Sequence, residues 1–185
     1  KFQNLLVNLK LKKKIFGLVI EPGMKYMNSS IKKPIFTKFL NKKKFSKAND
    51  FVFEAHSTDY QPKKILLNLV DNNFKFLKVG PELTYNYSRS LFFMNKIENK
   101  FFKNPTSDIK KNILLSMKEK NKYWKEYYDK NNDLLLLNSK LDRSRYYLNT
   151  KNVKNSIRIL KNNVNILDKK DIISFIGNNF KKDFL

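Results

Sequence analysis

Three short segments rich in apolar residues mark the first half of the chain and are predicted as strands, at Ile15–Ile20, Phe51–Ala55 and Phe74–Val79. The first is a continuous apolar run, which favours a β-strand that is covered on both faces, as in a parallel sheet. Apolar positions recur at helical spacing over Pro62–Val70 and Glu82–Lys100, which predicts a helix after the second strand and after the third. Alternation of strands and helices is typical of parallel βα units, so the pattern predicts an α/β fold.

The remaining elements predicted from the pattern are helices. Between the first two strands, apolar residues at helical spacing predict a helix from about residue 34 to 44. Beyond a linker at Asn104–Ser107 the strand signal stops. The helices predicted there are Asp108–Glu119, Asn121–Tyr128, Val153–Asn163, Asp168–Ile176 and Asn178–Leu185. We therefore expect a βα part over residues 1–103 and a helical extension over residues 104–185.

Each predicted strand ends in a polar or Gly/Pro-rich motif, with the sequences EPG, EAHSTD and VGPELT. The carboxyl ends of neighbouring parallel strands meet at one edge of a sheet, where functional groups collect. We therefore expect Glu21, Glu54, His56 and the Gly80–Thr84 loop to converge on one rim of the sheet.

The second of these motifs holds His56, the only histidine in the chain. Side chains alternate along a strand, so Glu54 and His56 are expected on the same face. An acid and an imidazole in this arrangement can hold a metal ion or transfer a proton, and Asp59 follows as a third catalytic candidate. The alternative is that His56 only hydrogen-bonds Glu54 within a core.

Two further segments are candidates for binding a phosphate group. Gly80 lets a ligand approach the backbone, and the helix expected after it, which includes Thr84, offers unpaired N–H groups. Arg143 and Arg145 are two of the few arginines, and guanidinium groups bind phosphate in a bidentate manner. The alternatives are an ordinary βα turn at Gly80 and a solvated pair of arginines.

Lysine dominates the charge of the chain, whose formal net charge is +23. Basic side chains neutralise phosphates, so a basic nucleic-acid-binding protein is one interpretation. The lysines are scattered, however, and their abundance together with asparagine, isoleucine, phenylalanine and tyrosine is typical of an AT-rich genome. No RGG, zinc-ligand or RNP-like pattern accompanies the charge. We favour compositional drift and expect no specific nucleic-acid partner.

Cysteine is absent, which excludes disulfides and thiolate chemistry. No apolar run is long enough to span a bilayer, and the basic N-terminal segment lacks the apolar core and cleavage site of a signal peptide. The simplest expectation is a cytoplasmic protein without a membrane partner. Because the chain begins with Lys1 rather than Met, we expect a fragment or a processed product.

Several longer motifs occur in an order that resembles one protein family. They are LVIEPGMKY, FVFEAHSTDYQ, FKFLKVGPELTYNYSRSLFFMNKIE, NKYWKEYY, LDRSRYY, NVKNSIRILKNNVN and DIISFIGNNFKKDF. Together they resemble the non-catalytic subunit of class II D-tagatose-1,6-bisphosphate aldolase, from the galactitol and N-acetylgalactosamine pathways. The resemblance covers essentially the whole chain from Ile15 onward.

The resemblance implies a (β/α)₈ barrel of the TIM type. This chain would hold its C-terminal half, about three βα units that form barrel strands six to eight, followed by the helical extension. It also implies a partner, the catalytic aldolase subunit, which splits tagatose 1,6-bisphosphate with a divalent metal such as zinc. The Gly-Asp-His segment of the family is absent here, so this chain is expected to support the partner rather than to catalyse the reaction alone.

Three positions depart from the family pattern. Glu21 stands where glutamine is usual, Lys25 where an acid is usual, and Leu148 where tryptophan is usual. The block from Glu54 to Asp59 is intact, which indicates that the ancestral site is kept.

One alternative is a metal-dependent ketose-phosphate aldolase or epimerase in its own right. Glu54 and His56 would then be metal ligands or acid–base groups, and the phosphate-binding candidates above would hold the sugar phosphate. The label of a tagatose-6-phosphate kinase, which the family also carries, gains no support, because the chain has neither a P-loop nor a kinase catalytic loop.

Overall fold

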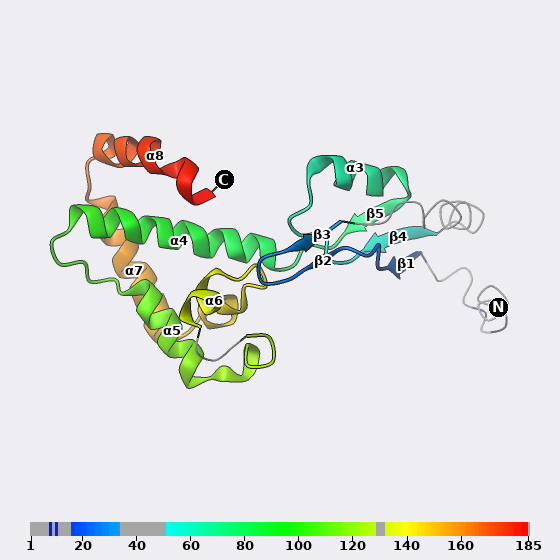
Figure 1. The fold of residues 1–185 in the computed structure, drawn as a ribbon, viewed down its shortest axis with the longest axis horizontal. Helices are drawn as coiled ribbons and strands as arrows, with labels where there is room; N and C mark the ends of the chain where they lie inside the picture. The colour runs from blue at the N-terminus through cyan, green and yellow to red at the C-terminus, as the bar shows by residue number, and fades with distance from the viewer. Residues whose placement is uncertain (1–7, 9, 11–15, 34–50, 129–131, 185) are drawn as a thin grey trace. The chain divides into compact units, whose positions relative to one another are not determined.

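The computed structural model describes residues 8, 10, 16–33, 51–128 and 132–184 (Figure 1). The helix predicted from about 34 to 44 lies outside these residues. The chain divides into two compact units, Lys1–Glu82 and Leu83–Leu185. The expected division after residue 103 differs from this one, because the long helix that precedes it packs with the second unit.

The first unit is built on a three-stranded parallel sheet. Its strands are β1 (Gly17–Ile20), β4 (Val52–Ala55) and β5 (Phe74–Leu77), in the spatial order β1-β4-β5. Helix α3 (Lys63–Asp71) connects β4 to β5. All three predicted strands are therefore present and parallel, and the α/β class is confirmed.

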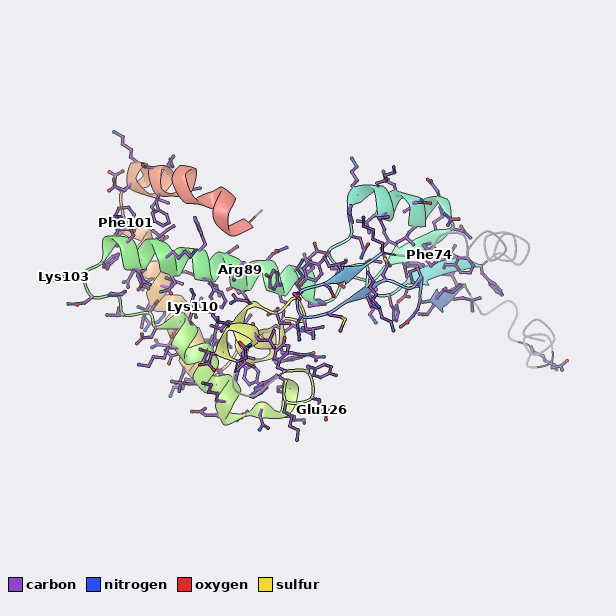
Figure 2. The ribbon with its side chains drawn as sticks, in the orientation of Figure 1. Phe74, Arg89, Phe101, Lys103, Lys110 and Glu126 are labelled. Carbon is purple, nitrogen blue, oxygen red and sulfur yellow. The ribbon has the colours of Figure 1, made fainter. Side chains whose placement is uncertain are left out.

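Helix α3 covers one face of this sheet. Phe53, Ala55 and Phe74 point toward it and are fully buried against Leu69. The rings of Phe53 and Phe74 lie 5.3 Å apart between centroids. Phe74, which is labelled in Figure 2, thus belongs to the core between the sheet and its helix.

A β-bulge in β5 changes which face the later side chains of this strand reach. Phe53 pairs with Phe74, but the next residue of β4, Glu54, pairs with Phe76, so Lys75 is an extra residue. Because side chains alternate along a strand, the extra residue moves Phe76 to the face opposite Phe74. Phe76 is accordingly exposed, whereas Phe74 is buried.

A small antiparallel hairpin follows β1 and was not predicted. It pairs β2 (Lys25–Tyr26) with β3 (Ile31–Lys32), and the N–H of Met27 donates to the carbonyl of Ser30 across its turn. Strands of two residues are too short to leave an alternating pattern, so the sequence carries little signal for them.

The second unit consists of helices. They are α4 (Pro81–Phe101, which begins at the last residues of the first unit), α5 (Ile109–Glu119), α6 (Asp133–Asn138), α7 (Lys151–Asn165) and α8 (Lys169–Phe184), with the short 3₁₀ helices η3 (Asn121–Tyr123) and η4 (Arg143–Tyr147). Helix α5 packs against α6 and α7. Their core includes Ile109, Ile113, Leu136, Val153 and Leu160, together with Leu91, Phe92 and Ile97 of α4.

Two of the helix predictions are wrong. The segments Asp168–Ile176 and Asn178–Leu185 were expected as separate helices, but α8 runs unbroken through Gly177, because a glycine inside a helix weakens it without ending it. The helix predicted at Asn121–Tyr128 is only the short η3 followed by turns. There the chain turns to bury Trp124, whose indole N–H donates to the carbonyl of Met117 at 2.6 Å.

No helix in the described part of the chain is both long enough and apolar enough to cross a membrane.

Candidate functional site

The end of β4 carries a paired acid and imidazole. The Nε2 atom of His56 lies 2.8 Å from Oε1 of Glu54, so the two side chains share one face as the alternation predicted. Their side chains are 31% and 35% exposed, respectively. The pair is therefore accessible at the end of a strand and is not part of a closed core.

This pair lies on the sheet face opposite α3. Across the sheet Glu54 is flanked by Val19 of β1 and Phe76 of β5, both of which are exposed. The ring of Phe16 adds an edge contact to Phe76, with 5.9 Å between centroids. In a βα barrel the helices cover the outside, so a face turned away from its helix corresponds to the inside of the barrel.

The loop after β4 holds two residues in a strained backbone conformation. Ser57 and Tyr60 have φ angles of 61° and 59°. Positive φ is uncommon for residues other than glycine and persists where surrounding contacts enforce it, often at functional loops. One such contact is Thr58, whose N–H and hydroxyl both donate to the carbonyl of Lys78, at 3.2 and 3.0 Å.

Asp59 joins this loop to the loop after β5. Its Oδ1 atom accepts hydrogen bonds from the N–H groups of Gly80 and Glu82, at 2.8 and 2.9 Å. In return, Oε2 of Glu82 accepts from the N–H of Tyr60 at 2.7 Å. Asp59 is 0% exposed, so its geometry is that of a positioning residue rather than of a group that meets a substrate.

The expectation of an open anion site at Gly80 is therefore corrected. A helix N-terminus attracts an anion because its first N–H groups lack partners. Here the carboxylate of Asp59 already occupies the N–H groups of Gly80 and Glu82. The sequence could not give this result, because Asp59 and Gly80 are distant along the chain and meet only when β4 and β5 pair.

The described residues do not supply a complete metal site. Among them, no group of three or more histidine, aspartate or glutamate side chains is placed to hold a metal ion, so neither Glu21 nor Asp59 completes one with Glu54 and His56. A catalytic zinc ion usually has three protein ligands. Glu54 and His56 remain two donors of a suitable kind, which is short of that number.

In the second unit, the side chain of Thr84 forms a hydrogen bond with a buried acid. Its side chain hydrogen-bonds the carboxylate of Asp142, which also accepts from the hydroxyl of Ser144 at 2.6 Å. Burial raises the pKa of Asp142, and the hydrogen bonds from Ser144 and Thr84 and the charge of Arg145 offset this only in part. Thr84 thus fixes the start of η4 to α4.

The two candidate arginines differ in their surroundings. Arg145 donates from Nη1 to the carbonyls of Leu141 and Asp142, at 2.7 and 2.8 Å, and from Nη2 to the hydroxyl of Tyr146 at 2.8 Å. The guanidinium of Arg143 instead lies 3.6 Å from the ring centroid of Tyr127. Of the four predicted phosphate-binding residues, Gly80, Thr84 and Arg145 are hydrogen-bonded through the groups expected to bind phosphate, whereas the guanidinium of Arg143 has no hydrogen bond to any described residue.

Helix α4 contains a buried carboxylate, Glu98, that was not predicted from the sequence. Glu98 is 0% exposed and accepts from the side chains of Asn95 and Asn163, at 3.0 and 2.7 Å, and from both the N–H and the hydroxyl of Ser107. Burial raises the pKa of Glu98, but the hydrogen bonds from Ser107, Asn163 and Asn95 outweigh it and lower the pKa overall. A glutamate between the apolar positions of a helix is the only signal, and Glu98 directly follows Ile97.

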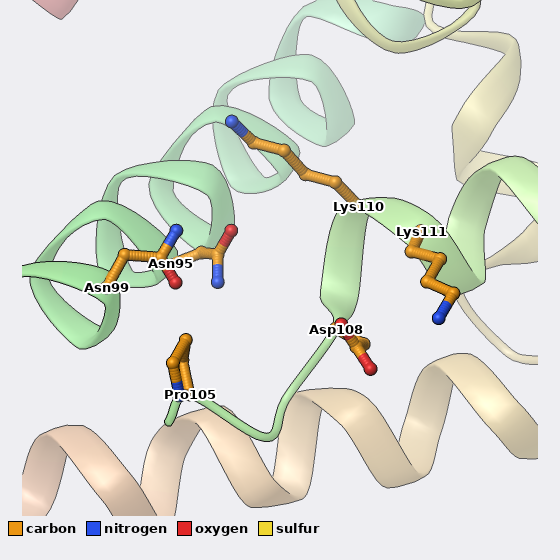
Figure 3. A pocket seen from close by; sticks show the side chains of 6 residues that line it. All are labelled: Asn95, Asn99, Pro105, Asp108, Lys110 and Lys111. Atoms are coloured by element: carbon orange, nitrogen blue, oxygen red, sulfur yellow. The ribbon is translucent and has the colours of Figure 1, made fainter. Parts of the chain in front are cut away.

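A shallow pocket of about 190 Å³ lies beside this network (Figure 3). Its lining residues are Asn95, Asn99, Pro105, Asp108, Lys110 and Lys111. Lys110 is also placed over the ring of Phe92, at 5.4 Å from its centroid. The carboxylate of Asp108 in the lining offsets part of the positive charge, so the pocket does not have the purely cationic character of a phosphate site.

Comparison with known proteins agrees with the family resemblance of the sequence motifs. Residues 2–181 match the family described as D-tagatose-1,6-bisphosphate aldolase subunit GatZ/KbaZ-like. A protein of Escherichia coli O1:K1 / APEC named D-tagatose-1,6-bisphosphate aldolase subunit GatZ is 30% identical over 166 residues, which cover 84% of this chain and 38% of that protein. The protein of the same name from Shigella boydii serotype 18 is 32% identical over 161 residues.

A solved structure extends the likeness to the fold. The crystal structure of a probable tagatose 6 phosphate kinase from Sinorhizobium meliloti 1021 superposes with a TM-score of 0.76 at 24% identity, covering 92% of this chain and 46% of that one. The likeness supports the TIM-type α/β fold, of which this chain forms a part. The chain spans about two fifths of the length of the curated relatives it matches, at 38%.

Proposed function

Since this chain belongs to the D-tagatose-1,6-bisphosphate aldolase subunit GatZ/KbaZ-like family, we propose that it serves as an accessory, non-catalytic part of that aldolase. In this role it supports the activity and the stability of a separate catalytic subunit. The pathway we propose is the breakdown of galactitol or N-acetylgalactosamine. The relatives it matches are themselves named as subunits of the aldolase, which supports a catalytic partner.

The main observation in support of the accessory role is the number of candidate metal ligands at the end of β4. Glu54 and His56 form a close pair, but the described residues add no third metal ligand to them. The metal of a class II aldolase is therefore proposed to lie in the catalytic subunit, and no reaction step is assigned to this chain. Glu54 and His56 instead provide polar groups at the inner end of β4, beside the strained residues Ser57 and Tyr60 of the following loop.

The exposed inner face of the sheet supports a role within a larger assembly. Val19 and Phe76 flank Glu54 there, and such an apolar row is normally covered. Strands β1 and β5 also have unpaired edges within the described sheet. We propose that further βα units, of the kind that the longer relatives have room for, cover this face.

The test is to mix the protein with the catalytic aldolase subunit of the same organism. We expect the cleavage rate of tagatose 1,6-bisphosphate to rise and thermal inactivation of the catalytic subunit to slow. Lysozyme, a basic protein of unrelated fold, controls for a general effect of positive charge. An unchanged cleavage rate together with unchanged inactivation would rule out the accessory role.

The paired Glu54 and His56 also support a second candidate, a ketose-phosphate aldolase or epimerase in its own right. If His56 transferred a proton in such a reaction, His56→Ala would lower that activity by about 10²- to 10⁴-fold. For an accessory subunit we expect His56→Ala to leave the stimulation of the partner within about twofold, because the side chain is partly exposed. Asp71→Ala, at an exposed position of α3, is the matched control for the rate assay.

A further inference from the structure

Three exposed tyrosines and a half-buried arginine gather around η3 and η4 in the second unit. We call Tyr123, Tyr127, Arg143 and Tyr146 the tyrosine–arginine cluster. Tyr123 stacks on Tyr146 with 4.8 Å between ring centroids and 22° between planes. The guanidinium of Arg143 lies 3.6 Å from the centroid of Tyr127 and 5.9 Å from that of Tyr146. Side chains from two separate segments of the chain thus form one cluster.

The rings of this cluster face solvent. Tyr123, Tyr127 and Tyr146 are 41%, 48% and 43% exposed. Each ring nevertheless has a packing partner: buried Tyr147 packs edge-on against Tyr123 and donates its hydroxyl proton to the carbonyl of Lys120, Tyr146 stacks on Tyr123, and Tyr127 lies against Arg143. Large side chains that are ordered before binding lose little conformational entropy when a partner covers them.

Arg143 belongs to this cluster, and its guanidinium N–H groups are not used within the described part of the chain. Its backbone N–H donates to the hydroxyl of Tyr128 at 3.2 Å, but its side chain forms no hydrogen bond with any residue that the structure describes. Stacking against Tyr127 holds the plane of the guanidinium in place. A fixed guanidinium with free N–H groups matches a carboxylate, which can accept two of them at once.

The charge around the cluster indicates which charge a partner surface should carry. Lys122 and Lys125 in or beside η3 and Arg143 and Arg145 of η4 outnumber the nearby described acids, which are Glu126, labelled in Figure 2, and the buried Asp142. Tyrosine and arginine are also the residues enriched at the energetically dominant centres of protein interfaces. The surface therefore suits a protein partner that presents acidic side chains.

We propose that the tyrosine–arginine cluster is the surface on which the catalytic aldolase subunit docks, with a carboxylate of that subunit held by Arg143. The proposal rests on the accessory function and goes beyond it by naming where the two proteins meet. Glu54 and His56 are not part of this contact, so association and this pair can be altered separately.

Binding of the full chain to the catalytic subunit, measured by titration calorimetry, tests the proposal. We expect Arg143→Glu and Tyr127→Ala each to weaken association by about 30-fold or more, as central interface residues do. Arg158→Glu is the matched control, because Arg158 is exposed on α7 and its side chain donates only to Asn155. This control should bind within about twofold of the unchanged chain.

Arg143→Gln keeps the size of the side chain without its charge, and the fluorescence of the buried Trp124 shows whether each variant is folded. Unchanged affinity in folded Arg143→Glu and Tyr127→Ala would overturn the docking surface while leaving the accessory function intact. Absence of binding by the unchanged chain would instead overturn the accessory function. A single-stranded oligonucleotide that binds only when Arg143 is present, without displacing the catalytic subunit, would assign the cluster to nucleic acid and overturn the proposal.

Discussion

Replacing Glu98 with glutamine is expected to lower the free energy of unfolding of the helical unit by about 2–4 kcal/mol. Each carboxylate oxygen of Glu98 accepts two hydrogen bonds, Oε1 from the N–H of Ser107 and Asn163, and Oε2 from Asn95 and the hydroxyl of Ser107. Glutamine puts an NH₂ group in place of one oxygen. In either orientation of the amide, a buried N–H donor, that of Asn95 or of Ser107, then faces another donor and loses its acceptor.

The effect of Glu98→Gln should depend on pH. The pKa of Glu98 is lowered in the folded chain, so the carboxylate contributes stability above its unfolded pKa, near 4.5, and loses it as the pH falls through the folded pKa. The difference between Glu98→Gln and the unchanged chain should therefore be full at neutral pH and shrink below about pH 4.5.

Urea denaturation followed by the fluorescence of Trp124 measures this effect, because Trp124 is the only tryptophan and is buried in the same unit. Glu119→Gln is the matched control, since Glu119 is exposed at the end of α5. Equal midpoints for Glu98→Gln and Glu119→Gln at neutral pH would show that the network around Glu98 adds nothing to stability.

Asp59→Ala is expected to release the loop after β4 from the loop after β5. The substitution removes the acceptor of two backbone N–H groups, those of Gly80 and Glu82, and a hydrogen bond to a charged group contributes about 1.5–3 kcal/mol. The amide protons of Gly80 and Glu82 should then exchange about 10- to 100-fold faster, since 1.4 kcal/mol corresponds to a factor of ten.

Hydrogen exchange resolved by residue measures this release. Asp59→Asn keeps one acceptor oxygen, so we expect a smaller acceleration at the same two amides. Asp71→Asn, at an exposed position at the end of α3, controls for the change of charge. Unaltered exchange at Gly80 and Glu82 in Asp59→Ala would mean that other contacts hold the two loops together.

The sequence predicted the parts of the molecule that depend on local patterns. The apolar runs gave the three parallel strands, and alternation alone placed Glu54 and His56 on one face, where they form a hydrogen bond. Long amphipathic stretches likewise gave α4, α5 and α7 to within a few residues. In each case the signal and the structure it specifies occupy the same short segment.

The roles of the candidate site residues could not be predicted in this way, because they depend on contacts between distant segments. Gly80 was expected to leave N–H groups free, but Asp59 occupies them. Arg143 and Arg145 are two residues apart and chemically identical, yet one is stacked on Tyr127 and the other is bonded to backbone carbonyls. Only the fold distinguishes them.

The bulge in β5 lets this strand hold one additional residue without exchanging its two faces. Lys75 is the extra residue between Phe74 and Phe76, and with the bulge Phe74 meets α3 while Phe76 lies on the opposite face. If Lys75 instead took a regular place in the strand, Phe76 would turn toward the helix and Leu77 away from it. Deleting Lys75 would leave a regular strand with Phe76 and Leu77 on their present faces. A homologue whose β5 is shorter by this one residue should therefore present the same inner surface beside Glu54.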